Sequence, residues 1–375
     1  MKEPSETTGS RGVAAISRLG AIVAATIVLL ILFDVLLRVV VAGSGILQTM
    51  VDIQAPATLY AKLEDFRNAK GLKVAVLGDS LVFGRAMRDK GDSGWRAHTL
   101  SSQLQGWLAE KHPGQPVSVA NFGMNGTLPT DLENLIRIVL PVRPDVIVFD
   151  LSLRSFSRDF DRDGDIRTRD WLNELNVSAD GTYSIVKDRG GLANWLHGQL
   201  VNYWFLYRFR DFLQSLLFDG SPFTFLASAR NAADSWLRGS AKDAGDDLGD
   251  VVLLMRARSR YEKIDLAPDN PQRQALDRIL NRLSEAKQPA LIFYATENPK
   301  VLPELLPRQT FDQLQAQLAQ IISPQPPSRV FVGPLAIYGA TDFLDHVHLD
   351  RVGYRRLSEQ LGPRIDEMIS QRVMR

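Results

Sequence analysis

The sequence predicts an α/β fold in which helices cover both faces of a central parallel sheet of about five strands. Two observations support this prediction. Amphipathic stretches alternate with short apolar runs, which indicates right-handed βαβ units. The apolar runs do not alternate with polar residues, as is typical of strands buried on both faces of a parallel sheet. These runs are Lys73–Leu77, Val117–Asn121, Val146–Leu151, Ala290–Thr296 and Arg329–Val332.

The first element along the chain is a hydrophobic segment at residues 20–42. Roughly 20 apolar residues are enough for a helix to cross the hydrocarbon core of a membrane. The apolar character continues past Asp34 and Arg38, which favours one uncleaved transmembrane anchor. A cleaved signal peptide, with Ala21–Phe33 as its shorter apolar region, is the alternative.

Charges around this segment predict its orientation. Arg11 and Arg18 precede it and no strong basic cluster follows closely, so residues 1–19 are expected in the cytoplasm. The chain would then be a single-pass protein of the cell inner membrane, with its main domain in the periplasm. Asp34 and Arg38 lie four residues apart on one face of the helix. The pair can neutralise itself along the helix or face a partner, or Arg38 snorkels to the outer interface beside Asp34.

Residues 43–70 are expected to form a stalk and a first helix, and residues 71–375 a single domain. The helices of this domain are predicted from amphipathic stretches that Pro and Gly residues delimit. They are Thr99–Lys111, Thr130–Leu140, Gln272–Ala286, Glu304–Ile322 and Arg351–Arg375.

A long insertion separates the third predicted strand from the fourth. Residues 156–270 far exceed a normal connection, so we expect them to form a helical insertion with its own structure. Trp195–Phe225 is dense in aromatic residues and Leu. It is interpreted as a helical cap packed on the core, as an interfacial element that touches the membrane or a membrane partner, or as a wall that lines the substrate site.

Composition excludes several classes of function. The chain has 44 Lys and Arg residues against 43 Asp and Glu residues, a formal net charge of +1, so no overall field favours nucleic acid. It has no cysteine, which excludes disulfides and thiolate metal sites. No cluster of His and Cys residues supports a zinc site.

Two short segments predict serine chemistry. A strand that ends in a tight Gly turn presents Ser80 at the carboxyl edge of the sheet, where open α/β sheets place their chemistry. Near the other end of the chain, Asp345 stands three residues before His348. An Asp and a His at this spacing can supply both a general base and the group that orients it. Together these segments indicate a serine acyl-transfer enzyme.

The order of three sequence blocks resembles the SGNH/GDSL hydrolase superfamily. The resemblance covers residues 72–155 and 288–365 and implies a three-layer α/β/α fold. The blocks are Gly78-Asp79-Ser80-Leu81, Asn121-Phe122-Gly123-Met124-Asn125-Gly126 and Asp345-His346-Val347-His348-Leu349. In this superfamily the first block carries the nucleophile, the second an oxyanion glycine and the third an Asp-x-x-His base.

The resemblance implies a role for each matching residue. Ser80 would attack an acyl carbonyl, His348 would carry its proton, and Asp345 would orient His348. The backbone N–H groups of Ser80 and Gly126 would bind the oxyanion, with Asn125 as a second candidate donor. Ordinary structural roles also fit single residues, because Ser80 suits a helix N-cap and His348 a satisfied polar position. His346 is a competing base, although its spacing from the Asp departs from the motif.

The third strand departs from the superfamily pattern, because Arg154 stands where an Asn usually supplies a side-chain amide. An Arg can donate to an oxyanion, bind an anionic substrate group or form a structural ion pair. Loss of that Asn also occurs in membrane-anchored SGNH-like proteins that handle acetyl or alanyl groups on envelope polymers. The resemblance therefore implies acyl transfer to or from a cell-envelope polysaccharide or secreted exopolysaccharide, with a membrane-bound O-acyltransferase as partner.

Two further hypotheses concern binding. A non-catalytic glycan-binding or scaffold protein that retains the fold is the alternative function, and Arg154 is its main support. Residues Asp159–Asp170 match a calcium-loop template in part, with Asp where the template has its final Glu. Neighbouring arginines also fit a solvated turn, so calcium stays open and the predicted chemistry requires no cofactor.

Overall fold

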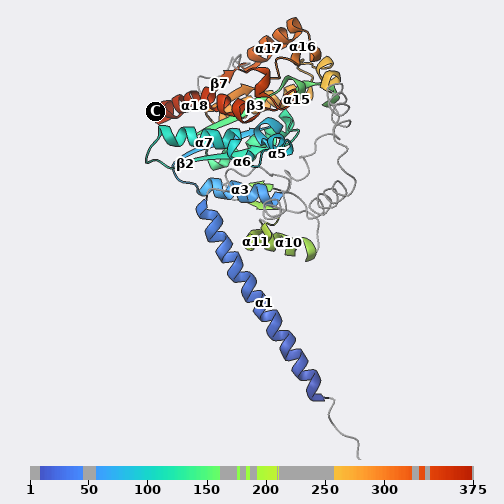
Figure 1. The fold of residues 1–375 in the computed structure, drawn as a ribbon, viewed down its shortest axis with the longest axis vertical. Helices are drawn as coiled ribbons and strands as arrows, with labels where there is room; N and C mark the ends of the chain where they lie inside the picture. The colour runs from blue at the N-terminus through green and yellow to red at the C-terminus, as the bar shows by residue number, and fades with distance from the viewer. Residues whose placement is uncertain are drawn as a thin grey trace, which may run out of the picture.

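In the computed structural model the described residues are 9–44, 56–160, 175–177, 183–185, 192–208, 210, 257–322, 329–333 and 338–373. They form an α/β domain from which one long helix projects (Figure 1).

The centre of the domain is a five-stranded sheet in which every pairing is parallel. This confirms the predicted fold class. The strand order is β2-β1-β3-β6-β7. The strands are β1 (Leu72–Gly78), β2 (Val117–Gly123), β3 (Val146–Leu151), β6 (Ala290–Tyr294) and β7 (Arg329–Val332).

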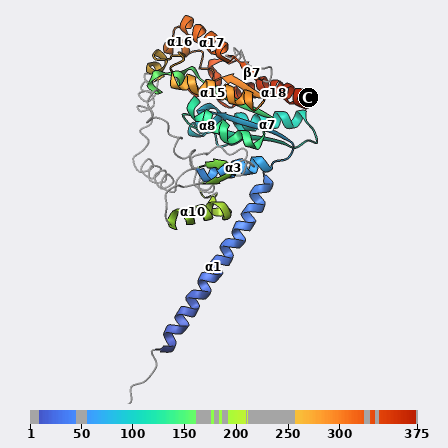
Figure 2. The same cartoon turned by 180° about the vertical axis from the view of Figure 1, so that it is seen from behind.

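Helices cover both faces of the sheet, which explains why the strands are mainly apolar runs without polar alternation. Along β1, Ala75 and Leu77 face one layer, whereas Val74 and Val76 face the other. The first layer holds α3 (Pro56–Asn68), α8 (Pro129–Val139), α15 (Pro271–Glu285), α16 (Leu302–Leu305) and α17 (Arg308–Ile322) (Figure 2). The second holds α4 (Ser80–Phe83), α5 (Arg85–Asp89), α6 (Trp95–His98), α7 (Leu100–Lys111) and α18 (Arg351–Val373).

One predicted helix is wrong in its extent. The sequence stretch Glu304–Ile322 contains only the last two residues of α16 and all of α17, because the chain is extended at Leu306 with φ −152° and ψ 133°. Pro307 follows, and the proline ring disfavours helical backbone at the residue before it. The break turns the chain between two helices that both pack on the same face of the sheet.

The path of the chain changes direction across the sheet at the carboxyl ends of β1 and β3. After β1 the chain forms β2 on one side of β1 and then crosses to form β3 on the other side. This edge is therefore a topological switch point. Two glycines allow close packing there. A Cβ on Gly78 would lie 2.2 Å from Oδ1 of Asp150, and a Cβ on Gly123 would lie 2.5 Å from the backbone nitrogen of Phe83.

The projecting helix is α1 (Gly9–Ser44). Its segment Gly20–Val40 has 21 residues and a mean hydropathy of 2.7, and only 6% of its most apolar window is buried. The segment is long and apolar enough to cross a membrane, and a signal sequence near an N-terminus has the same properties.

The described part of the insertion contains helices and an unpredicted hairpin. The helices are α10 (Leu192–Tyr203) and α11 (Phe205–Arg208), and the antiparallel hairpin is formed by β4 (Leu175–Val177) and β5 (Tyr183–Ile185). The two ends of the insertion meet, since Ser157 pairs with Ile264 in a β-bridge. Both α10 and α11 lie beside the upper part of α1 (Figures 1 and 2).

Candidate active site

Ser80 is the first residue of α4, directly after the turn that ends β1. Asp79 caps this short helix, and its Oδ1 accepts from the backbone N–H of Leu81 at 2.8 Å. Two neighbours fix α4 from outside. Asn121 on β2 and Tyr354 on α18 donate to carbonyls of α4 at 2.9 and 2.6 Å. The Ser80 side chain is therefore carried by a turn that the sheet and a helix both hold in place.

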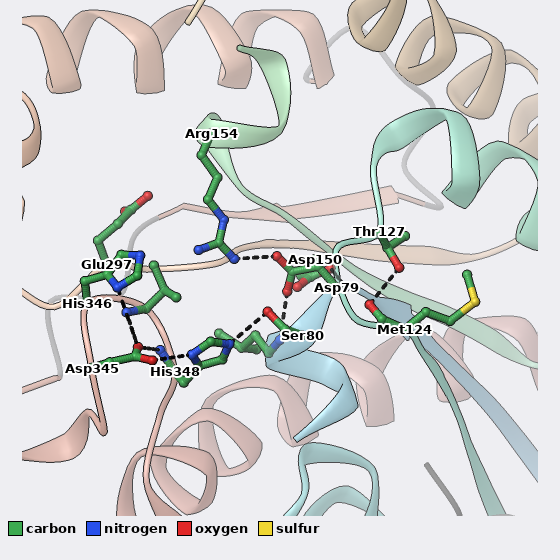
Figure 3. Close-up of polar contacts among 12 residues, drawn as sticks. Asp79, Ser80, Met124, Thr127, Asp150, Arg154, Glu297, Asp345, His346 and His348 are labelled. Carbon is green, nitrogen blue, oxygen red and sulfur yellow. Dashed lines mark hydrogen bonds and ion pairs between the residues drawn. The ribbon is translucent and has the colours of Figure 1, made fainter. Parts of the chain in front are cut away.

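The structure brings the three predicted catalytic side chains together, although 268 positions separate Ser80 from His348 (Figure 3). The Ser80 Oγ lies 2.9 Å from Nε2 of His348. The opposite ring nitrogen, Nδ1, lies 2.6 Å from Oδ2 of Asp345. A hydroxyl, an imidazole and a carboxylate in this order form the arrangement that a nucleophilic Ser requires.

The loop that carries Asp345 keeps its carboxylate ionised. Its Oδ1 accepts from the backbone N–H groups of Val347 and His348, each at 2.8 Å. Burial alone would raise the pKa of Asp345, but the hydrogen bond and charge of His348 and these N–H groups outweigh burial and hold the pKa well below its usual range. An ionised Asp345 only accepts, so Nδ1 of His348 donates to it and Nε2 is free to accept the Ser80 proton.

Arg154 forms an ion pair beside the nucleophile. Its Nη2 lies 2.7 Å from Oδ2 of Asp79, and the two side chains are 17% and 8% exposed. Burial would raise the pKa of Asp79, but the charge of Arg154 and the hydrogen bonds to Asp79 keep it lowered. Among the sequence-based alternatives for Arg154, the structure shows the ion pair. Direct donation to an oxyanion stays a prediction.

Asp150 lies next to this pair, and no sequence motif pointed to it. Its Oδ1 accepts from the backbone N–H of Asp79 at 3.1 Å, and its buried Oδ2 has no hydrogen-bond partner among the described residues. Burial and the charge of Asp79 raise the pKa of Asp150 well above its usual range, which favours the protonated form. The available signal was a single carboxylate inside the apolar run Val146–Leu151.

A second buried carboxylate that no sequence motif pointed to is Glu297. Tyr261 donates to its Oε1 at 2.6 Å, and Tyr294 donates to the same group at 2.7 Å. Burial raises the pKa of Glu297, against the opposing effect of these two hydrogen bonds. Tyr261 lies near the end of the insertion, so this cluster ties the insertion to β6. Only the position of Glu297 just after the fourth apolar run hinted at it.

His346 lies near Asp345 but outside the hydrogen-bond chain. Its Nδ1 is 3.9 Å from Oδ1 of Asp345, whereas the ring bonded to Ser80 is that of His348. The backbone carbonyl of His346 accepts from the N–H of Asn298 at 2.9 Å, so the residue also anchors the loop. Burial lowers the pKa of His346 to about 4, against the opposing charge of Asp345.

The low pKa of His346 predicts a pH-dependent stability. The unfolded ring has a pKa near 6.5 and the folded ring one of about 4. Between these values the unfolded state binds more protons, so stability rises with pH across this window. We expect His346→Gln to remove up to about 3 kcal/mol of this rise. The free energy of unfolding in urea, measured for both proteins across this pH range, tests the effect. The same pH dependence in the wild type and the variant would contradict it.

The predicted oxyanion residues Gly126 and Asn125 lie in the exposed turn after β2. Gly126 has φ +73°, a left-handed conformation that favours glycine. The turn is held close to Ser80, since the backbone N–H of Met124 donates to the Gly78 carbonyl at 2.9 Å. Their role as donors stays a prediction.

The calcium hypothesis falls mostly on residues 161–170, which lie outside the described residues. Of the loop's first two residues, Asp159 accepts from Nζ of Lys263 at 2.7 Å. Within the described part of the chain, no group of three or more His, Asp or Glu side chains is arranged to hold a metal.

No family model and no curated protein matches the chain. Solved structures similar to it include a carbohydrate acetylesterase family member from Sinorhizobium meliloti, with 14% identity, a TM-score of 0.33 and coverage of 80% of this chain and 100% of that chain. A catalytic mutant of an acetylxylan esterase from Geobacillus stearothermophilus has 12% identity, a TM-score of 0.38 and coverage of 80% and 96%. Scores this low assign neither a family nor a substrate to this chain.

Proposed function

We propose that this chain is a membrane-anchored serine acyl-transfer enzyme of the SGNH/GDSL type. The observation that carries the proposal is the continuous hydrogen-bond chain from Ser80 through His348 to Asp345. Each residue taken alone fits an ordinary structural role. A half-buried, ionised carboxylate that orients a base against a serine hydroxyl at a sheet switch point fits catalysis better.

The proposed reaction has two steps through an acyl-Ser80 intermediate. Ser80 Oγ attacks the acyl carbonyl while its proton passes to Nε2 of His348, and His348 then returns that proton to the leaving alcohol. In the second step an acceptor hydroxyl, from water or a sugar, gives its proton to His348 and attacks the acyl-Ser80. Ser80 leaves and recovers the proton. Asp345 stabilises the imidazolium in both steps.

Stabilisation of the oxyanion is assigned to backbone N–H groups. Ser80 begins α4, so its N–H has no acceptor within that helix. The N–H of Gly126, with Asn125 beside it, completes the proposed site from the turn after β2. Because the guanidinium of Arg154 is bound to Asp79, we assign Arg154 to positioning of the Ser80 turn.

The proposed substrate is an O-acetylated polysaccharide of the cell envelope or a secreted polysaccharide, with transfer or removal of the acetyl group. The apolar span Gly20–Val40 supports a membrane anchor. We place the anchor in the inner membrane and the α/β domain in the periplasm, because Arg11 and Arg18 precede the span. An anchored domain suits an acyl donor delivered within the membrane, so a membrane-bound O-acyltransferase is the proposed partner.

The first test treats the full-length protein in detergent with a fluorophosphonate and measures its intact mass. We expect one adduct that maps to Ser80 and is absent from Ser80→Ala, because only a serine activated by a base reacts readily. A folded protein without an adduct would favour the glycan-binding scaffold. Where the adduct forms, an acetyl ester with and without a deacetylated oligosaccharide separates transfer from hydrolysis.

A further inference from the structure

The helices α10 and α11, here called the insertion helix pair, are attached to α1 by polar contacts. The backbone N–H of Leu206 donates to Oδ1 of Asp34 at 2.5 Å. Arg38 donates to the carbonyl of Tyr203 at 3.3 Å, and its guanidinium lies 5.6 Å from the ring centre of Phe205. Asp34 and Arg38 also pair with each other at 3.2 Å. The two charges of the apolar span therefore bind the insertion.

The depth of this contact along α1 is defined by the sequence. Asp34 lies six residues and Arg38 two residues before Val40, where the apolar span ends. At a rise of about 1.5 Å per residue, these positions are about 9 and 3 Å from the end of the span. Amphipathic helices that lie on membranes bury their apolar face about 5–10 Å into the boundary between headgroups and acyl chains. The contact on α1, at about 3–9 Å from the end of the span, overlaps this range.

The insertion helix pair exposes large apolar side chains beside this span. Leu192, Trp195, Leu196 and Tyr203 are 71%, 59%, 44% and 76% exposed. The first three lie at positions i, i+3 and i+4 of α10, so they share one face of the helix. Trp and Tyr are the residues enriched where a membrane meets water.

A cavity of about 590 Å³ separates α10 from α1. Its walls are mainly apolar, with Ile27, Leu30 and Ile31 on α1 and Leu200 on α10. The outer surface of α1 is exposed around this cavity, and apart from Arg38 and Thr26 that surface is apolar along the span. Hydrocarbon chains of lipids that surround α1 have direct access to the cavity and match its walls.

We propose that the insertion helix pair lies in the interface of the bilayer that α1 spans and holds the α/β domain against the membrane surface. The partner is the lipid of the leaflet nearer the domain. The inference rests on the proposed anchor. It gives the insertion a function as a second membrane contact, which fixes the height of the domain above the bilayer.

Single-cysteine variants provide the test, because the chain has no cysteine of its own. Leu196→Cys places a fluorescent label on the proposed membrane face, and Leu29→Cys places one within the apolar span. Ser93→Cys is the control on an exposed loop of the α/β domain. Each full-length variant is reconstituted into phosphatidylcholine–phosphatidylglycerol vesicles with lipid-attached quenchers, located either near the headgroup or near the bilayer centre.

We expect the label at position 196 to be quenched several-fold more by the shallow quencher than by the deep one. The label at position 29 should respond more to the deep quencher, and the label at position 93 to neither. If position 29 is quenched and position 196 behaves like position 93, the inference is overturned while the anchor stands. If position 29 is also unquenched, the anchor itself fails and the inference fails with it.

Discussion

Ser80→Ala is expected to lower kcat/KM for a small acetyl ester by about 10⁴-fold or more, because the nucleophile disappears while the backbone donors remain. The hydroxyl lost is the one that lies 2.9 Å from Nε2 of His348. Initial rates with p-nitrophenyl acetate measure the effect, with circular dichroism to show that the fold is retained.

Two variants sharpen this prediction. Ser93→Ala changes a serine of the exposed loop before α6 and should leave the rate unchanged. The double variant Ser80→Ala/His348→Ala should lose no more than Ser80→Ala alone, since residues that act as one unit are not additive. A rate loss of less than about tenfold in Ser80→Ala would show that Ser80 is not the nucleophile.

Arg154→Met is expected to destabilise the protein by about 3–5 kcal/mol, because it leaves the charge of Asp79 buried without its partner. Asp79 is 8% exposed and Arg154 17%, so water compensates little for the lost ion pair. The free energy of unfolding in urea measures the effect. Activity should fall as well, since Asp79 caps the helix that carries Ser80.

The matching double variant distinguishes a buried pair from a general packing defect. Asp79→Asn/Arg154→Met removes both charges and retains an acceptor for the N–H of Leu81, so it should recover much of the lost stability. The exposed pair of Arg308 with Asp312 is the control, and Arg308→Met should cost no more than about 1 kcal/mol. Equal losses for the double and single Arg154 variants would contradict the predicted coupling.

Local sequence was sufficient to predict the sheet and most of its helices. The five apolar runs became the five parallel strands, because strands buried on both faces are mainly apolar along their length. Pro and Gly residues also predicted most helix ends, because each of them acts on the backbone at or next to its own position. The prediction of a single helix failed at Leu306. The amphipathic pattern continues past Pro307, but the ring of Pro307 disfavours helical backbone at Leu306.

The named motifs also pointed to Ser80, Asp345 and His348, because the chemistry of a nucleophile and its base limits which residues and spacings serve it. The sequence motifs also included the glycines at the ends of β1 and β2. Their physical reason, the lack of room for a Cβ beside Asp150 and Phe83, came only from the assembled structure.

The environment of these residues was decided by the tertiary structure alone. The spacing from Asp345 favoured His348 over His346, but only the folded loop after β7 brings Nε2 of His348 within 2.9 Å of Ser80 Oγ, 268 positions away. The pairing of Arg154 with Asp79 joins the ends of two strands, and Glu297 meets a tyrosine of the insertion. Burial and distant charges determine such pairings and the resulting pKa shifts, and neither is a property of a local stretch of sequence.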